Sequence, residues 1–424
     1  MLTLAFLLPL LTQSLPTQEA PDPNPGNGQR FGRCIVALSD LDGDGQRELA
    51  VGMPFANAVL VHSGAQRDVI QTWKGGGGFG NTLAHAGDVN GDGIPDVLVG
   101  YADFQDGLAS KTDVCSGKDG VLLWRYERMS CDVAGLGDLD RDGCADLALV
   151  GEDTFQVRSG KTGKVLAQRV DSGWRSTFWL MGDYDRDGVA DALQLDPIPG
   201  VLYSARPNKS QTDSVPESLY PLQAQAPLVA LCGPAVEGRL ENIVFASHAG
   251  DWDRDGQDDV FLITKRDAAY EASVYAGSFQ RKPLAAIPLS TLLTHYTQTR
   301  PGSPGRIGFE PNSGGGMILS ADLNGDGTND LVWAEAAMSF MSHLTVYSGL
   351  DGKVLWERKG PVVGGKTGLA ITLYDDYDED GTPDILVGSS DWILHGPCYE
   401  GDVQLLSGKS GLPLWKIADP AANR

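Results

Sequence analysis

The sequence predicts an all-β fold, a seven-bladed β-propeller whose blades are four-stranded and antiparallel. Three observations support this prediction. One acidic pattern with an internal glycine occurs seven times in the 424 residues. Each copy leads directly into a short, mostly apolar run, which is typical of a buried strand rather than a helix. The copies begin 45 to 71 residues apart, and a four-stranded propeller blade needs about 40–50 residues.

The clearest copy of the pattern runs from Asp88 to Asp96 and continues into the apolar residues 97–100. Side chains with oxygen atoms occupy positions 1, 3, 5 and 9, and a glycine occupies position 6. Ca²⁺ takes six to eight oxygen ligands, and glycine permits the sharp turn between them. We therefore predict up to seven Ca²⁺ ions, each held in a hairpin loop between two strands. The predicted ligands, loop by loop, are Asp40, Asp42, Asp44 and Glu48; Asp88, Asn90, Asp92 and Asp96; Asp138, Asp140, Asp142 and Asp146; Asp183, Asp185, Asp187 and Asp191; Asp251, Asp253, Asp255 and Asp259; Asp322, Asn324, Asp326 and Asp330; Asp376, Asp378, Asp380 and Asp384.

An EF-hand is one alternative for such a loop, and the sequence excludes it. An EF-hand needs a bidentate glutamate at position 12, followed by a helix. Here position 12 is never acidic; it is Val51, Val99, Leu149, Gln194, Leu262, Trp333 and Val387. Solvated acidic turns without metal are the other alternative. We expect the second and sixth loops to bind Ca²⁺ more weakly, because Asn90 and Asn324 leave them three carboxylates instead of four.

Each repeat has the same order of expected strands. A strand such as 32–38 enters the acidic loop, and the buried strand 49–52 leaves it. A third strand ends in Ser-Gly, as in residues 60–64, and a tight turn leads to a fourth strand such as 121–124. Because a ring removes the exposed edges of a row of sheets, the repeats are expected to close into a propeller. We expect closure by packing of the blades, with no strand exchanged between the ends.

The expected domain boundaries follow from these repeats. They are a signal peptide at 1–20, a linker at 21–30, a propeller at 31–418 with blades at about 31–74, 75–126, 127–170, 171–223, 224–290, 291–360 and 361–418, and a C-terminal tail at 419–424. The apolar run 2–11 is too short to span a bilayer and suits a signal peptide, so we expect a secreted or periplasmic protein. No later segment has the length of a membrane span. Residues 224–242 fit no repeat strand and are read as an insertion.

Composition narrows the classes of partner. The net charge of −23 argues against nucleic acid as a partner. The chain is expected to be a monomer. Six cysteines allow fifteen pairings, which the sequence cannot choose between. Buried free thiols and a disulfide between Cys34 and Cys398, which lie in the first and last repeats, both remain open.

The repeats resemble the FG-GAP/VCBS repeats of integrin α-subunit propellers and of many secreted bacterial proteins. Phe31-Gly32 and Phe79-Gly80 match the FG pair, and Gly52-Met53-Pro54 matches the GAP triplet. Blades 3 to 7 keep the acidic loop but lose most of these two motifs. The resemblance implies a propeller with Ca²⁺ in hairpin loops on one face and partner binding usually on another surface. It does not extend to integrin ligand recognition.

A weaker resemblance links the Ser-Gly-Lys turns to the tryptophan turns of quinoprotein dehydrogenases. Here Trp124, Trp356 and Trp415 are expected to act as packing anchors between blades, and no adjacent Cys-Cys pair is present.

Two functions are compatible with the sequence. The first is a non-catalytic binding scaffold, stabilised by Ca²⁺, for an extracellular glycan or protein. The second is an enzyme that acts on polysaccharide, such as a lyase, with groups assembled from loops between blades. The six histidines are scattered and no catalytic motif occurs, so no catalytic residue is predicted. Within the long segment 291–316, His295 and Tyr296 would be the first residues to test for activity.

Overall fold

The regular secondary structure of the described residues is almost wholly β-strand. The computed structural model describes residues 29–102, 110–127, 132–150, 154–170, 177–180, 192–195, 201–203, 217–218, 243–256, 259–266, 269–276, 284–287, 317–336, 342–360, 367–390 and 401–420. Within these ranges the only helical element is a single 3-10 turn, η1, at Pro54–Ala56. None of the described helical structure is long and apolar enough to cross a membrane.

Five of the described sheets have four antiparallel strands in chain order. They are β1 (Ile35–Ala37), β2 (Leu49–Met53), β3 (Ala58–His62) and β4 (Val69–Lys74); β5 (Thr82–Gly87), β6 (Asp96–Ala102), β7 (Ser110–Cys115) and β8 (Leu122–Tyr126); β17 (Ile243–Gly250), β18 (Asp259–Arg266), β19 (Ala269–Tyr275) and β20 (Ala285–Ile287); β21 (Met317–Ala321), β22 (Asp330–Ala336), β23 (Ser342–Tyr347) and β24 (Val354–Gly360); β25 (Thr367–Tyr374), β26 (Asp384–Ser390), β27 (Asp402–Leu406) and β28 (Pro413–Ala418). The predictions of an all-β fold and of repeated four-stranded antiparallel sheets are confirmed.

Two sheets depart from the expected pattern. One combines β9 (Asp132–Gly137), β10 (Asp146–Val150), β11 (Thr154–Arg158) and β12 (Val165–Val170) with the two-residue strand β16 (Glu217–Ser218), which pairs with β12 in parallel. The other has only three strands, β13 (Thr177–Leu180), β14 (Ala192–Leu195) and β15 (Val201–Tyr203). Three antiparallel strands of the 171–223 repeat are described, and residues 204–216 lie outside the described residues, so a fourth strand in this repeat stays a prediction.

Adjacent sheets pack face to face, which explains the apolar second strands. In β2, Leu49 and Val51 lie in one core with Leu386 of the last sheet. Between them, Ala50 lies in a different core with Val97 of the second sheet. Because successive side chains of a strand point to opposite faces, β2 must be apolar on both faces to fill both cores.

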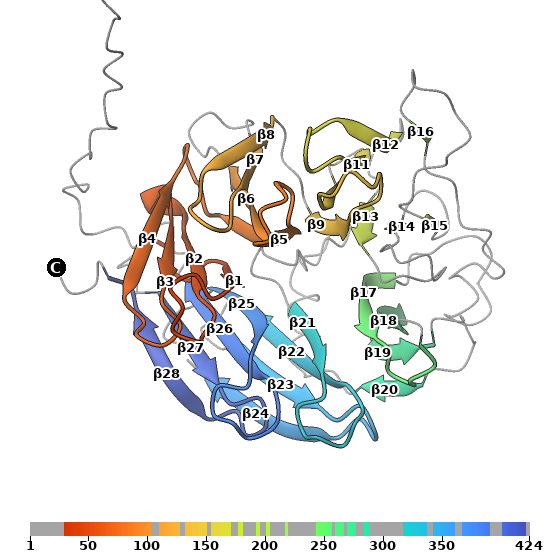
Figure 1. Cartoon of the computed structure of the whole chain (residues 1–424). Coiled ribbons are helices and arrows are strands. Elements are labelled where there is room, and N and C mark those ends of the chain that lie inside the picture. The colour runs from red at the N-terminus through yellow and green to blue at the C-terminus, as the bar shows by residue number, and fades with distance from the viewer. Residues whose placement is uncertain are drawn as a thin grey trace, which may run out of the picture.

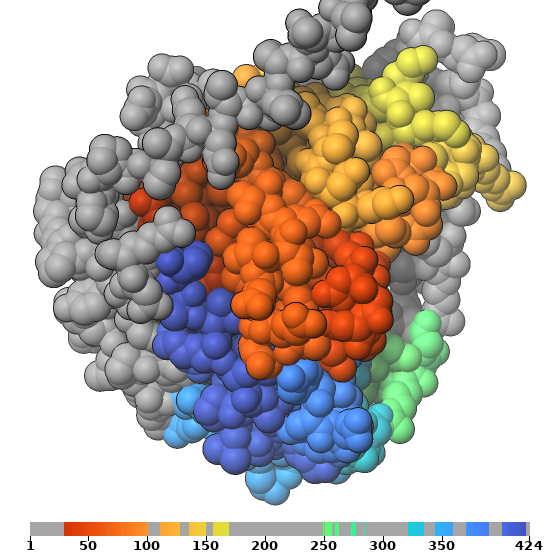
Figure 2. All heavy atoms as spheres, turned by 60° about the vertical axis from the view of Figure 1, so that its left-hand side comes forward, coloured from red at the N-terminus to blue at the C-terminus, as the bar shows by residue number. Residues whose placement is uncertain are grey.

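The first and last sheets are neighbours. Figure 1 shows the sheets following one another around a common centre, with β1 beside β25, and Figure 2 shows the same two sheets in contact. The hydroxyl of Tyr374 donates a hydrogen bond to the carbonyl of Arg47 at 2.7 Å, and the Arg67 guanidinium reaches the hydroxyl of Tyr377 at 3.4 Å. Each of these two sheets uses only its own consecutive strands. The contact is made by packing, as predicted.

Tryptophan side chains anchor neighbouring sheets, as the sequence predicted. The indole of Trp124 on β8 donates to the carbonyl of Gly160 in the next sheet at 2.6 Å. Trp356 on β24 donates in the same way to Gly408 at 2.8 Å. Trp415 on β28 lies in the core shared by the last and first sheets.

Residues at the expected boundaries take part in the packing. Arg30, expected in the linker, is buried and its guanidinium lies over the ring of Phe55, 4.4 Å from the ring centroid. Asp419, expected in the tail, is buried and its N–H donates to Gly401. The signal-peptide segment lies outside the described residues.

The described cysteines are free thiols. They are Cys34, Cys115 and Cys144, and all three are buried. The Cys34 thiol donates to the carbonyl of Gly80 at 3.1 Å. This agrees with the alternative of buried free thiols. The proposed partner of Cys34 in a disulfide, Cys398, lies outside the described residues.

Candidate calcium loops

The acidic loops occupy the same place in each sheet, between its first and second strands. Six of the seven are described, at least in part: 40–48, 88–96, 138–146, 251–259, 322–330 and 376–384. The loop at 183–191 and its four predicted ligands lie outside the described residues, as do His295 and Tyr296. We number the loops 1 to 7 in chain order.

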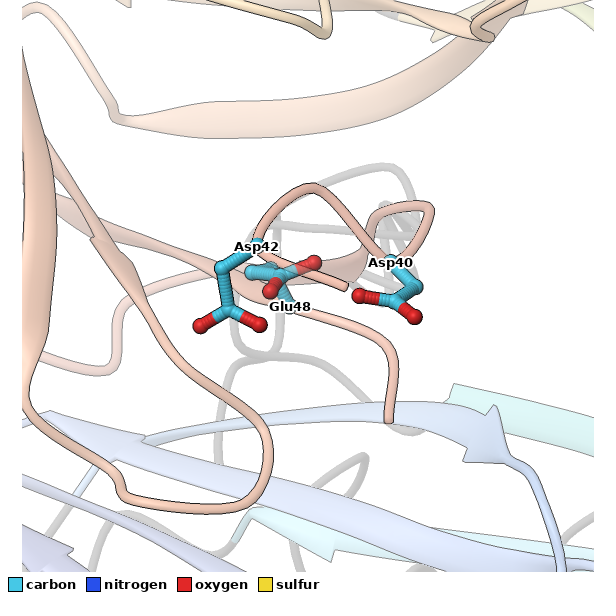
Figure 3. Close-up of side chains that lie close together, drawn as sticks. All are labelled: Asp40, Asp42 and Glu48. Carbon is cyan, nitrogen blue, oxygen red and sulfur yellow. The ribbon is translucent and has the colours of Figure 1, made fainter. Parts of the chain in front are cut away.

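Carboxylates converge in four of these loops. In loops 1, 3 and 7, oxygens from positions 1, 3 and 9 lie within 4.8 Å of one another: Asp40, Asp42 and Glu48; Asp138, Asp140 and Asp146; Asp376, Asp378 and Asp384. In loop 5 the converging residues are Asp251, Asp253 and Asp255. Figure 3 shows the group in loop 1, where the three carboxyl groups lie close together and Glu48 stands between Asp40 and Asp42. Position 5 is outside the group in loops 1, 3 and 7; in loop 1, Asp44 accepts a hydrogen bond from the Ser63 hydroxyl at 3.0 Å.

The glycine at position 6 shapes each loop. Its N–H donates to the carboxylate at position 1, for example Gly45 to Asp40 at 3.0 Å and Gly381 to Asp376 at 2.8 Å. In the described loops this glycine has φ between 84° and 91°, a region that side chains with a Cβ rarely adopt. The turn folds the backbone around the position-1 carboxylate and so brings it toward position 9.

The carboxylate at position 9 is fully buried in all six described loops. One of its oxygens accepts the N–H of position 2, as Asp384 does from Tyr377 at 2.8 Å. In four loops the other oxygen accepts the N–H of the glycine in the Ser-Gly pair that ends the third strand. These pairs are Gly117 to Asp96 at 3.0 Å, Gly160 to Asp146 at 3.1 Å, Gly349 to Asp330 at 3.0 Å and Gly408 to Asp384 at 3.1 Å. We call Gly117, Gly160, Gly349 and Gly408 the clamp glycines.

Sequence reasoning recognised the Ser-Gly pair only as a hairpin turn and missed its contact with the loop. A Cβ built on a clamp glycine would lie 1.8 to 2.0 Å from the carbonyl oxygen of position 8 of the same repeat's loop. Only glycine therefore lets the turn approach the loop closely enough for its N–H to reach position 9. The repetition of Ser-Gly after five of the seven loops was the available signal.

The Gly349→Ala variant is expected to lose about 2–3 kcal/mol of stability through overpacking against backbone atoms. Its new Cβ would meet the Asn329 carbonyl oxygen at 1.9 Å. Denaturant unfolding of this variant and of Leu350→Ala, which changes an exposed neighbour, measures the difference. Equal stability of the two variants would contradict the close approach.

Loops 2 and 6 carry asparagine at position 3, and their local geometry differs accordingly. In loop 6 the Asn324 amide nitrogen donates to Asp326 at 2.9 Å, and in loop 2 the Asn90 amide nitrogen is 3.4 Å from Asp96. An amide N–H cannot coordinate a cation, so the side chain must turn before its oxygen can do so. Weaker binding of Ca²⁺ in these two loops stays a prediction.

The donor set fits a hard cation. All the predicted ligand atoms are oxygens, as Ca²⁺ requires. Two of them, Oε1 of Glu48 and Oδ1 of Asp251, are buried and have no hydrogen-bond partner. A buried carboxylate oxygen without a partner is costly unless a cation or a proton satisfies it. Positions 1, 3, 5 and 9 would hold the ion, whose positive charge would offset the repulsion between them.

Burial also perturbs the acid–base behaviour of position 9. Desolvation raises the pKa of Asp146 from its ordinary value of 3.8 to about 6, and that of Asp384 likewise. It raises the pKa of Glu48, Asp96 and Asp330 in the same direction. With pKa values near 6, Asp146 and Asp384 are partly protonated just below neutral pH.

Without metal, the protein is expected to become more stable as the pH falls from 7 to 5. With a folded-state pKa near 6 and an ordinary value of 3.8 in the unfolded chain, Asp146 and Asp384 bind more protons when folded. This contribution is fully present below about pH 4 and is lost as the pH rises through 6. Melting temperatures in a chelator at pH 5 and 7 measure the effect. A lower melting temperature at pH 5 than at pH 7 would contradict it.

Comparison with known proteins agrees with this geometry. Residues 40–99 match a family model described as an FG-GAP-like repeat. Integrin alpha-V of Gallus gallus is 26% identical over 215 residues, covering 41% of this chain and 21% of the integrin. Integrin alpha-2 of Mus musculus is 37% identical over 87 residues, covering 17% of this chain and 7% of the integrin. The matches thus span only 7% to 21% of these integrins' own length.

Solved structures also resemble the chain. A chain in the crystal structure of BBS1N in complex with ARL6DN, soaked with lead, has a TM-score of 0.47 and 11% identity, covering 86% of this chain and 91% of that one. The family match contains loops 1 and 2 and the Phe79-Gly80 pair. Residues 40–99 are thus similar to an FG-GAP-like repeat, and parts of the chain are similar to integrin α-subunits.

Proposed function

We propose that this protein is a Ca²⁺-stabilised seven-bladed β-propeller that serves as a non-catalytic interaction scaffold for an extracellular glycan or protein. The convergence of carboxylates in loops 1, 3, 5 and 7, each between the first and second strands of its sheet, is the observation that carries the proposal. The integrin α similarity supports a binding role. The loops join the first three strands of a blade, which is why we assign them a structural role within a scaffold.

A cation in such a loop would act on the architecture of the blade. The position-1 carboxylate closes the turn between the first two strands. The position-9 carboxylate accepts the N–H of position 2, at the start of the loop, and the N–H of the clamp glycine, at the end of the third strand. An ion bound to both positions would therefore fix three strands of one blade relative to one another. This is a structural task, and it leaves the surfaces away from the loops available for a partner.

We propose a secreted location, with residues 1–20 acting as a signal peptide, and a monomeric state. The low millimolar Ca²⁺ outside cells suits loops with the affinity of extracellular modules, whose Kd values are about 0.1–1 mM. The similarity to integrin α-subunits supports an extracellular location. A secreted bacterial origin for this type of repeat stays a prediction from the sequence.

The experiment that tests the scaffold role is a binding and cleavage panel. The purified Ca²⁺-loaded protein is incubated with immobilised and soluble polysaccharides and with extracellular-matrix proteins, and both retention and the release of new chain ends are scored. Retention without cleavage is the expected result. Release of new chain ends would instead establish the polysaccharide-active enzyme and would make His295 and Tyr296 the first residues to mutate. Absence of both retention and cleavage would contradict the proposed scaffold for these ligand classes.

A further inference from the structure

Trp252 makes two hydrogen bonds that lead to two different loops. It occupies position 2 of loop 5 and is buried, with 5% of its surface exposed. Its main-chain N–H donates to Oδ2 of Asp259, the position-9 carboxylate of loop 5, at 2.7 Å. Its indole N–H donates to the carbonyl oxygen of Gly349, in the next sheet, at 2.9 Å.

Gly349 is the clamp glycine of loop 6. Its own N–H donates to Oδ1 of Asp330, the position-9 carboxylate of that loop, at 3.0 Å. A continuous chain of hydrogen bonds therefore runs from Asp259 through Trp252 and Gly349 to Asp330. It joins the two carboxylates that lie deepest in loops 5 and 6, and both of them are fully buried.

This link is special to loop 5 among the described loops. The other described position-2 residues have no side-chain N–H to donate; they are Leu41, Val89, Leu139, Leu323 and Tyr377. Trp124 and Trp356 bind the clamp glycines Gly160 and Gly408 in the same way, but they come from fourth strands and not from an acidic loop. Their hydrogen bonds reach one loop each, and the hydrogen bonds of Trp252 reach two.

We propose that Trp252 is a positioning residue that couples loops 5 and 6, so that Ca²⁺ in loop 5 raises the affinity of loop 6 for Ca²⁺, and the reverse. The inference rests on the proposed binding of Ca²⁺ by these loops. An ion held by Asp251, Asp253 and Asp255 that also contacts Asp259, the fourth predicted ligand of loop 5, would fix Asp259 and with it the main chain of Trp252. The indole then holds Gly349 in the orientation that presents its N–H to Asp330. Coupling between two binding sites is reciprocal by linkage.

The loss of one hydrogen bond in such a chain corresponds to about a fivefold change in affinity. The test compares four forms of the full-length protein: the wild type, the double variant Asp251→Asn/Asp255→Asn, the single variant Trp252→Phe, and the combination of all three changes. The double variant removes two charges from loop 5 while keeping its shape. Hydrogen exchange of the peptide that contains Gly349 is followed as a function of Ca²⁺ concentration. Native mass spectrometry counts the bound ions in parallel.

We expect the effect of the loop-5 changes on the Ca²⁺ midpoint of Gly349 to depend on whether Trp252 is present. In the wild-type background, the loop-5 changes should raise the Ca²⁺ midpoint for protection of Gly349 about fivefold. In the Trp252→Phe background, the same changes should leave that midpoint unaltered within twofold. Trp356→Phe is the matched control, because it removes an equivalent indole hydrogen bond to Gly408 and should leave the coupling of loops 5 and 6 intact.

A second contact between the loops provides a further control. The guanidinium of Arg254, at position 4 of loop 5, lies beside Gly327 of loop 6. Arg254→Gln should preserve the fivefold response, and loss of the response in this variant would overturn the assignment to Trp252.

The remaining outcomes separate the two proposals. If ions bind but the loop-5 changes leave the Gly349 midpoint of the wild type unaltered, the coupling is overturned, whether or not Trp252→Phe folds. If the wild type binds no Ca²⁺ at all, both the coupling and the proposed function are overturned.

Discussion

Chelation of Ca²⁺ is expected to lower the melting temperature of this protein by about 10 °C. Sites with Kd values of about 0.1–1 mM stabilise a protein by roughly 0.4–1.4 kcal/mol each at about 1 mM Ca²⁺. Seven such sites together contribute from a few to about 10 kcal/mol, which is comparable with the stability of a whole domain. Without the ion, the converging carboxylates of loops 1, 3, 5 and 7 repel one another at less than 4.8 Å.

Calorimetric scans in 1 mM Ca²⁺ and in an excess of chelator measure this effect. Mg²⁺ serves as the control, because it demands near-ideal octahedral geometry and should restore only a small part of the loss. Superimposable scans with Ca²⁺ and with chelator would remove the metal assignment and would favour solvated acidic turns.

Asp384→Ala is expected to cost about 2–6 kcal/mol even in the presence of chelator. The carboxylate accepts the N–H groups of Tyr377 at 2.8 Å and Gly408 at 3.1 Å. Alanine would leave both donors without their acceptor beside a fully buried site, at about 1–3 kcal/mol for each. Denaturant unfolding measures the loss.

Asp378→Ala is the matched variant within the same loop. Asp378 belongs to the same cluster but is exposed, so its replacement should change stability in chelator by less than about 0.5 kcal/mol. Both variants should lose the stabilisation by Ca²⁺ at loop 7. If the two variants were equally stable in chelator, position 9 would have no structural role apart from metal binding.

Much of the fold could be predicted because its determinants are local and repeated. The strand expected at 49–52 is β2 at Leu49–Met53. A short apolar run between an acidic loop and a turn is typical of a buried strand and is too short for a helix. The strand expected at 32–38 was longer than β1, which is Ile35–Ala37. Gly32 has φ of 79° and a Cβ there would lie 2.6 Å from the Asp402 carbonyl oxygen, so this residue belongs to the junction with the last sheet.

The parts that could not be predicted depend on contacts between distant residues. The clamp glycines act on a carboxylate 14 to 24 residues away, and Trp252 reaches Gly349 across 97 residues. Each of these residues has an ordinary local explanation, as a turn glycine or a core aromatic. The neighbouring sequence does not distinguish this local role from a contact with a distant loop. The parallel pairing of β16 with β12 is likewise set by tertiary structure and not by the pattern of two residues.

The position of the acidic loops has a consequence for protein engineering. In an antiparallel sheet the turn between the second and third strands emerges at the end opposite to the turn between the first and second. In the first sheet this distal turn is η1 with Asn57, which adopts a left-handed conformation. A peptide grafted into this turn would be displayed away from the acidic loop at 40–48. One grafted peptide could therefore be replaced by another without changing the loop that is proposed to bind Ca²⁺.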